Sequence, residues 1–268
     1  MNHTLIHLTD IHAVPGGERL HGSVDSVAGL RAALAAVSAA GLPVSAFVLS
    51  GDIADQGDEE SYRTVDALVA PVARELGAAV VVAMGNHDEP AAFRAGLGVS
   101  RTDSVTTAGG LRIVALDSTV PGHHHGELGD DQLAWLAGVL AEPALDGTVL
   151  VLHHPPIPSV LPLMDGIGLR EPHRLAEVVA GTDVRVVLAG HTHSATMGEL
   201  AGVPVWVGPG NAYAADTMAP AGLTRAVHLQ AYTRVDLRDS GVTATLVPIS
   251  AVPPVYELPT EVLLSHIG

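Results

Sequence analysis

The chain has 268 residues, 47% of them apolar, so it is long enough to bury a large hydrophobic core. It contains no cysteine, which excludes disulfide bonds and thiolate metal ligands. The formal net charge is -16 and there is no lysine, which argues against nucleic acid or an anionic membrane as a partner. The 15 histidines are the unusual feature of this composition.

The first part of the chain alternates apolar strands with amphipathic helices. Ser23 is a candidate N-cap for the first helix. This alternation indicates parallel strands joined by helical crossovers, with a functional site where the strands end. The expected strands cover residues 5–8, 46–50 and 78–84, and the expected helices cover residues 23–40 and 59–76.

The pattern continues with a hairpin, a polar loop and two further strand–helix units. After residue 195 it changes to four consecutive strands with short turns, which we expect to form a second, more antiparallel sheet packed on the first. The expected elements are strands at 105–107, 111–116, 148–152, 186–189, 196–200, 203–207, 231–237 and 242–247, and helices at 130–140 and 172–180.

We expect one domain over residues 1–248 and an arm along its surface over residues 249–268, because the arm is proline-rich and has no clear period. No apolar run approaches the ~20 residues of a membrane span. The first strand begins within a few residues of Met1, which leaves no room for a signal peptide. We therefore expect a soluble cytoplasmic protein.

Two histidines in Gly190-His191-Thr192-His193 follow an apolar strand, and residues two apart point to the same side of an extended segment. Such a pair alone is weak evidence, but other strands also end in polar residues. These strand-end residues are Asp10, His12, Asp52, Asn86, His87, His153, His191 and His193.

Oxygen and imidazole donors of this kind favour Mn, Fe or Zn over Ca or Cu(I). Eight residues are too many for one ion and suit two divalent metal ions, and an ion pair ~3.5–4 Å apart stabilises both the attacking and leaving oxygens of phosphoryl transfer. The pattern therefore predicts phosphate ester hydrolysis. The alternative is a set of strand-end polar residues that bind no metal.

The motifs D-x-H, G-D-x-x-D, G-N-H-D, H-H-P-P and G-H-x-H occur here in that order. Together they resemble the calcineurin-like metallophosphoesterases, over residues 5–207. The stretches at 121–127 and 153–161 look like the class III cyclic nucleotide phosphodiesterases of that family. The resemblance implies an α/β fold, a four-layer α-β-β-α sandwich of two packed mixed sheets flanked by helices.

The resemblance also implies roles for the motif residues. Asp52 would bridge the two metals, and a hydroxide between them would be the nucleophile. The first metal would be held by Asp10, His12 and His193, and the second by Asn86, His153 and His191.

Three neighbours of these ligands have implied or candidate roles. His87 would stabilise charge on the phosphate or protonate the leaving oxygen, and a merely structural histidine is the alternative. Asp55 matches the position that hydrogen-bonds His87 and orients it, although a turn cap would also explain it. His154 would pack behind His153, but the sequence leaves open that the two are exchanged.

The motifs predict the residues that contact the substrate less clearly than they predict the metal ligands. Asn86 and His87 would lie at the phosphate, and one of His123, His124 and His125 would face the substrate, for which we take His124 as the candidate. Asn211 is a further candidate for the pocket wall, although an ordinary turn asparagine is the simpler reading.

We therefore predict a binuclear phosphodiesterase that hydrolyses small-molecule phosphodiesters, namely 3',5'-cAMP or 2',3'-cyclic nucleotides. A glycerophosphodiesterase or a broad-specificity phosphodiesterase would share every metal motif, and a non-catalytic scaffold of the same fold is the remote alternative. The group that the chain resembles often forms dimers, and the sequence leaves a homodimer open.

Overall fold

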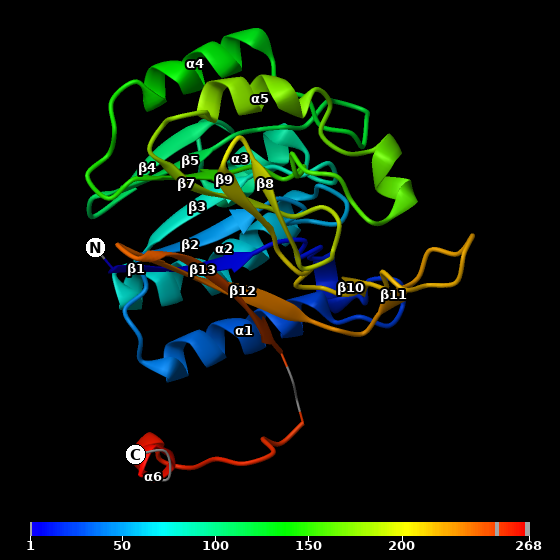
Figure 1. The fold of residues 1–268 in the computed structure, drawn as a ribbon. Coiled ribbons are helices and arrows are strands. Elements are labelled where there is room, and N and C mark those ends of the chain that lie inside the picture. The colour runs from blue at the N-terminus through cyan, green and yellow to red at the C-terminus, as the bar shows by residue number, and fades with distance from the viewer. Residues whose placement is uncertain (1, 250–251, 266–268) are drawn as a thin grey trace.

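The computed structural model describes residues 2–249 and 252–265, and it confirms two mixed β-sheets packed together and flanked by helices (Figure 1). The five-stranded sheet consists, in spatial order, of β13 (Gly241–Pro248), β12 (Ala231–Arg238), β1 (Asn2–Leu8), β2 (Ala46–Ser50) and β3 (Ala79–Ala83). The six-stranded sheet consists of β4 (Ser104–Ala108), β5 (Leu111–Ala115), β6 (Thr148–Val151), β7 (Val184–Ala189), β9 (Val203–Val207) and β8 (Thr196–Leu200).

Helices cover the outer face of each sheet. The five-stranded sheet packs against α1 (Ser26–Ala40), α2 (Glu59–Leu76) and α3 (Pro90–Leu97). The six-stranded sheet packs against α4 (Asp130–Leu140) and α5 (Pro172–Val179), which lie together in Figure 1. The remaining elements are the short helices η1 (Pro15–Gly17), η2 (Pro162–Gly166) and α6 (Thr260–Leu264) and the short strands β10 (Ala214–Ala215) and β11 (Ala226–Val227).

Three apolar layers follow from this arrangement. The middle layer lies between the two sheets and includes Leu5, Val48 and Val149, all 0% exposed. The two outer layers fill the space between each sheet and its helices. The central strands are therefore buried on both faces, which explains why they read as continuous apolar runs rather than as alternating patterns.

One prediction about the sheets is wrong. The four strands after residue 195 do not form a separate antiparallel sheet but divide between the two sheets. β9 pairs in parallel with β7, and β12 pairs antiparallel with β1, where Leu5 faces Val235. The sequence showed the short turn within each pair of strands. Which sheet each pair joins depends on pairing with strands far away in the chain.

Local boundaries also differ from the predictions. The helix expected from residue 23 begins at Ser26, because Asp25 caps it by accepting a hydrogen bond from the Ala28 amide. Ser23 is not the cap. Helix α3 was not predicted, although Glu89 caps it and Pro90 occupies its first turn.

Residues 252–265 are exposed and extend away from both sheets rather than along their surface (Figure 1). The division into a domain and an arm stays a prediction. Within residues 2–249 and 252–265, no helix combines the length and the apolar character that a bilayer crossing demands.

Candidate metal centre

The carboxyl ends of parallel strands from both sheets converge on one site. Strands β1, β2 and β3 of one sheet, and β6 and β7 of the other, each end just before a candidate ligand. Three groups of donor atoms result, each with all its atoms within 4.8 Å of one another. They are Asp10 with His12 and His193, His12 with Asp52 and His87, and Asp52 with His153 and His191.

The first group presents two imidazole lone pairs to one point. His12 Nδ1 donates to Asp55 Oδ1 at 3.0 Å, and His193 Nδ1 donates to the Tyr213 carbonyl at 3.1 Å. With those protons on Nδ1, the two Nε2 atoms are unprotonated, and they face each other at 3.1 Å. Asp10 Oδ1 lies 3.3 Å from His193 Nε2. Two lone pairs and a carboxylate at one point suit a cation.

The group formed by Asp52, His153 and His191 likewise presents imidazole nitrogens whose lone pairs are free. His153 Nδ1 donates to the Ser50 carbonyl at 2.9 Å, which leaves Nε2 buried without a hydrogen-bond partner. His191 Nε2 donates to the Ile167 carbonyl at 2.9 Å, which leaves Nδ1 as the free lone pair. Asn86 Oδ1 is also buried without a partner. Buried polar atoms are normally hydrogen-bonded, so these atoms fit a second cation.

Asp52 lies between the two groups. Its Oδ2 atom is 3.6 Å from His12 Nε2 and 3.3 Å from His153 Nε2, and its Oδ1 accepts a hydrogen bond from the His87 amide. The side chain is 2% exposed. It is therefore the carboxylate that both groups can share.

Burial and charge act against each other at these residues. Burial lowers the pKa of His153, but Asp52 opposes it and raises the pKa to about 9. Burial would raise the pKa of Asp52, but His153 holds it well below its usual range. Burial and the neighbouring His153 lower the pKa of His191 to about 4. The Asp52 carboxylate therefore stays ionised, as cation binding requires, and a cation would replace the proton that Asp52 holds on His153.

The backbone at the site is strained in a consistent way. Eight non-glycine residues in the described part of the chain have a positive φ, and five of them are candidate ligands. Such conformations cost of order 1–3 kcal/mol each and persist where function requires them. The five ligands are Asp10, His12, Asp52, His191 and His193.

Glycine is required beside these ligands. Gly51 has φ +95°, and a Cβ there would lie 2.5 Å from His153 Nδ1. A Cβ at Gly85 would collide with the Asp52 carboxylate. The glycines of the G-D and G-N-H motifs therefore let two loops approach closely.

Asp55 hydrogen-bonds His87 through its backbone carbonyl rather than through its carboxylate. His87 Nδ1 donates to the Asp55 backbone carbonyl at 2.8 Å, while the Asp55 carboxylate is 3.8 Å away and bonds His12 instead. The spacing in G-D-x-x-D brings Asp55 to both histidines, but its carboxylate orients a candidate ligand. The His87 side chain is 37% exposed.

The histidine-rich loop contacts the site through His124. Asn86 Nδ2 donates to His124 Nδ1 at 3.3 Å, and the His124 ring centroid is 6.4 Å from that of His87. His123 is exposed, and His125 is buried with its Nε2 atom 3.2 Å from Glu127 Oε1. Of the three histidines, His124 therefore lies nearest the proposed phosphate site.

His154 holds this loop in place. Its ring is fully buried, its Nδ1 accepts from the Ser118 hydroxyl at 2.8 Å, and its Nε2 donates to the His124 carbonyl at 3.1 Å. A Cβ at Gly126 would lie 2.5 Å from the His154 ring. Both nitrogens are engaged away from the donor groups, which supports His153 rather than His154 as the ligand.

Asn211 lies away from the open part of the site, whereas Tyr213 contacts a candidate ligand. Asn211 is 0% exposed and its amide lies 3.4 Å from the Ala231 carbonyl, so the structure does not place it on an open pocket wall. Tyr213 stacks on His193, with ring centroids 4.2 Å apart.

Asp88 is a buried site residue that sequence reasoning missed. Its carboxylate accepts hydrogen bonds from the Ile53, Ala54 and Gly85 amides and from the Tyr62 hydroxyl. It thereby joins the loop after β2 to the loop after β3, which carry Asp52 and Asn86. The signal was present, since Asp88 is the last residue of G-N-H-D.

Comparisons with known proteins agree with this geometry. A sequence model of the family described as calcineurin-like phosphoesterase matches residues 3–195. A Rhodococcus erythropolis protein named "probable cyclic nucleotide phosphodiesterase" is 43% identical over 255 residues, covering 93% of this chain and 84% of the relative. A Mycobacterium tuberculosis protein named as a cAMP/cGMP dual specificity phosphodiesterase is 45% identical over 229 residues, covering 84% and 72%.

A solved structure shows the same fold at much lower identity. A dimetal phosphatase from Danio rerio superimposes with a TM-score of 0.62 at 16% identity, covering 92% of this chain and 99% of that protein. The family model matches well over half of the chain, and the two bacterial relatives are 43% and 45% identical to it over most of its length. The chain belongs to the calcineurin-like phosphoesterase family.

Proposed function

We propose that the chain is a binuclear metal-dependent phosphodiesterase that hydrolyses cyclic nucleotides. The observation that carries this proposal is the pair of buried donor groups that meet at Asp52. The similarity to two relatives named as cyclic nucleotide phosphodiesterases supports the substrate class.

The proposed ligands divide between two cations. Asp10, His12 and His193 would hold the first, Asn86, His153 and His191 would hold the second, and Asp52 would be shared. Two divalent cations, when bound, lower the pKa of water to provide a hydroxide nucleophile and offset charge on the phosphate. The donor set fits Mn, Fe or Zn and does not distinguish between them.

The chain's own residues supply the remaining chemistry. His87 is oriented by the bond from Nδ1 to the Asp55 carbonyl, so the doubly protonated ring would donate its Nε2 proton to the leaving oxygen. Asn86 Nδ2 and His124 lie together beside it and would contact the phosphate oxygens. Asp55 and the Ser50 and Tyr213 carbonyls keep three ligand imidazoles in the required tautomer.

The net charge of -16 does not exclude an anionic substrate. Divalent cations are the largest local charges in such a site and reverse its sign at short range. A polyanion feels the acidic surface over a longer distance, so we expect small phosphodiesters rather than nucleic acid.

A substrate panel tests the proposal. With Mn²⁺ added, we expect hydrolysis of 3',5'-cAMP and 2',3'-cyclic nucleotides to exceed that of glycerophosphodiesters and phosphate monoesters. An Asp52→Asn preparation, purified in parallel, controls for contaminating hydrolases. A preference for glycerophosphodiesters would favour the alternative substrate class, and no hydrolysis of any diester would favour the scaffold.

A further inference from the structure

A second cavity adjoins the candidate metal centre on the side of His191. Its volume is about 310 Å³, and His191 and Thr192 form the wall nearest the metal ligands. Two segments form the other walls, residues 155–159 after β6 and residues 164–172 around η2. Neither segment contributes a proposed metal ligand or a phosphate contact, so the cavity is unexplained by the hydrolytic chemistry.

The lining of this cavity is mostly apolar. Pro156, Pro158, Ile157, Met164 and Leu169 line it, and its polar side chains are Ser159, Asp165, Arg170, His191 and Thr192. Ligand pockets typically combine such apolar walls with a few placed polar groups. Proline rings offer apolar C–H surface to an aromatic ring, and the Met164 thioether is attracted to it because sulfur and aromatic rings interact favourably. The chain itself places no aromatic side chain there.

One wall of the cavity is tied to a proposed ligand. His191 Nε2 donates to the Ile167 carbonyl at 2.9 Å, so the segment that carries Met164 and Leu169 is fixed relative to the metal centre. The same segment pairs with the histidine-rich loop, because the Gly126 amide donates to Gly168 and the Arg170 amide donates to Gly126. The cavity is therefore preformed beside the site of the reacting phosphate.

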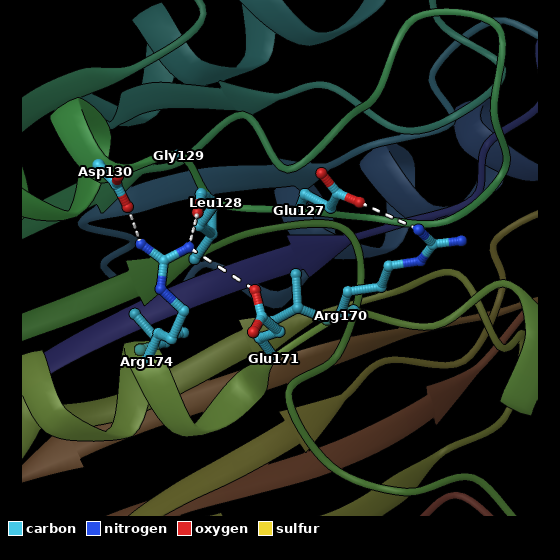
Figure 2. Close-up of a pocket in the computed structure, with 9 residues that line it drawn as sticks. Glu127, Leu128, Gly129, Asp130, Arg170, Glu171 and Arg174 are labelled. Carbon is cyan, nitrogen blue, oxygen red and sulfur yellow. Dashed lines mark hydrogen bonds and ion pairs between the residues drawn. The ribbon is translucent and has the colours of Figure 1, made fainter.

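A neighbouring hollow, lined by residues 127–130 and by residues of 169–175, is closed by ion pairs rather than by apolar side chains. Figure 2 shows its two arginines engaged with acidic residues: Arg170 pairs with Glu127, and Arg174 pairs with Asp130 and Glu171. Arg174 also donates to the Leu128 carbonyl. These contacts fasten the start of α5 to the loop before α4. They leave no arginine of this hollow free for an anion and they brace the outer wall of the apolar cavity.

We propose that the apolar cavity holds the nucleobase of the substrate while the cyclic phosphate lies at the metal centre. This inference rests on the proposed function and adds the place where the base binds. The apolar walls contact the two faces of the base, and Ser159 is the polar group for its edge. The Ser159 hydroxyl accepts from the Leu161 amide at 3.1 Å, so its hydrogen can be donated.

A single hydroxyl donor does not distinguish purines, because adenine and guanine both carry ring nitrogens that accept a hydrogen bond. The cavity therefore predicts similar use of adenine and guanine cyclic nucleotides. The cavity on the other side of the centre is lined by Asn86 and His124, the proposed phosphate contacts, so we assign it to the phosphate rather than to the base.

The test compares cyclic AMP with methyl riboside 3',5'-cyclic phosphate, which keeps the sugar and the cyclic diester but has no base. We expect the wild-type protein to favour cyclic AMP in kcat/KM. Met164→Ala should reduce that preference roughly tenfold, mainly through KM, because apolar contacts to a substrate are worth this much. Leu163→Ala is the matched control, since Leu163 lies in the same turn of η2, is 53% exposed and does not line the cavity.

The outcomes separate the two proposals. A reduced preference in Met164→Ala, with the preference retained in Leu163→Ala, supports the base site. An unchanged preference in Met164→Ala, in a protein that hydrolyses cyclic AMP, overturns the base site and leaves the proposed function in place. If the wild-type protein hydrolyses the base-free diester but not cyclic AMP, the proposed function fails and the base site fails with it.

Discussion

Asp52 and His153 are in contact, with Oδ2 3.3 Å from Nε2, although Asp52 follows β2 of one sheet and His153 follows β6 of the other. Both side chains are almost fully buried. The contact crosses the interface between the two sheets at the end of their parallel strands. The packing of one sheet on the other is therefore what completes the candidate metal centre.

Replacing Asp52 tests this shared position. Asp52→Asn removes the negative charge that both donor groups face, so we expect the metal content to fall and diester hydrolysis to drop more than roughly 100-fold. Elemental analysis and steady-state kinetics measure both effects. Asp66→Asn, on the exposed face of α2, is the control and should retain metal and activity. Full activity in Asp52→Asn would contradict the shared role.

His87→Ala should separate catalysis from metal binding. The His87 side chain is anchored by the Asp55 carbonyl and is partly exposed, so its removal should leave both metals bound. We expect kcat to fall by about 100- to 10,000-fold, as for the loss of a general acid. Loss of metal from this variant would show that His87 is a ligand instead.

Asp55→Ala, in contrast to His87→Ala, should weaken metal binding. Its carboxylate holds His12 by a 3.0 Å hydrogen bond, so the variant should bind the first metal about 10- to 100-fold more weakly. Added Mn²⁺ should restore much of the activity of Asp55→Ala and none of that lost in His87→Ala. Titrations of activity against metal concentration measure this contrast. Equal rescue of the two variants would mean that Asp55 does not act through His12.

His154→Ala should loosen the histidine-rich loop. It removes the imidazole partners of the Ser118 hydroxyl and the His124 carbonyl, which costs about 1–3 kcal/mol of stability. Because His124 contacts Asn86, we also expect a higher KM, measured alongside the unfolding free energy. His123→Ala, at an exposed position of the same loop, should change neither quantity.

His7 makes stability depend on pH. Burial lowers its pKa to about 4 in the folded protein, although Asp10 opposes the shift. The unfolded chain therefore binds the proton more readily between pH 4 and the ordinary value of 6.5, and folding stability falls as the pH falls through this window. The full effect is about 3 kcal/mol.

Urea unfolding of chelator-treated protein across this pH range measures the effect of His7. His7→Gln can keep the hydrogen bond to Ser50 and should show a shallower loss of stability towards acid than the wild type. His228→Gln, at an exposed position, should keep the wild-type slope. Equal slopes for wild type and His7→Gln would show that protonation of His7 does not limit acid stability.

The candidate ligands were predictable from the sequence because each belongs to a short motif. An apolar strand followed by Gly-Asp, Gly-Asn-His or Gly-His-x-His identifies both the ligand and the end of the strand. These are local signals, since strand periodicity and glycine requirements extend over only a few residues. They also indicated the chemistry of the donors, while the composition excluded thiolates and the resemblance carried by the motifs implied the two-sheet fold.

The tertiary structure decided which partners those residues meet. It divided the last four strands between two sheets, turned the Asp55 carboxylate to His12, and brought His124, one of three adjacent histidines, to Asn86. It also brought residues 155–172 against His191 to form the apolar cavity. Strand pairing, hydrogen bonds and burial link residues far apart in the chain, and no short stretch of sequence specifies which of several similar partners lies nearest.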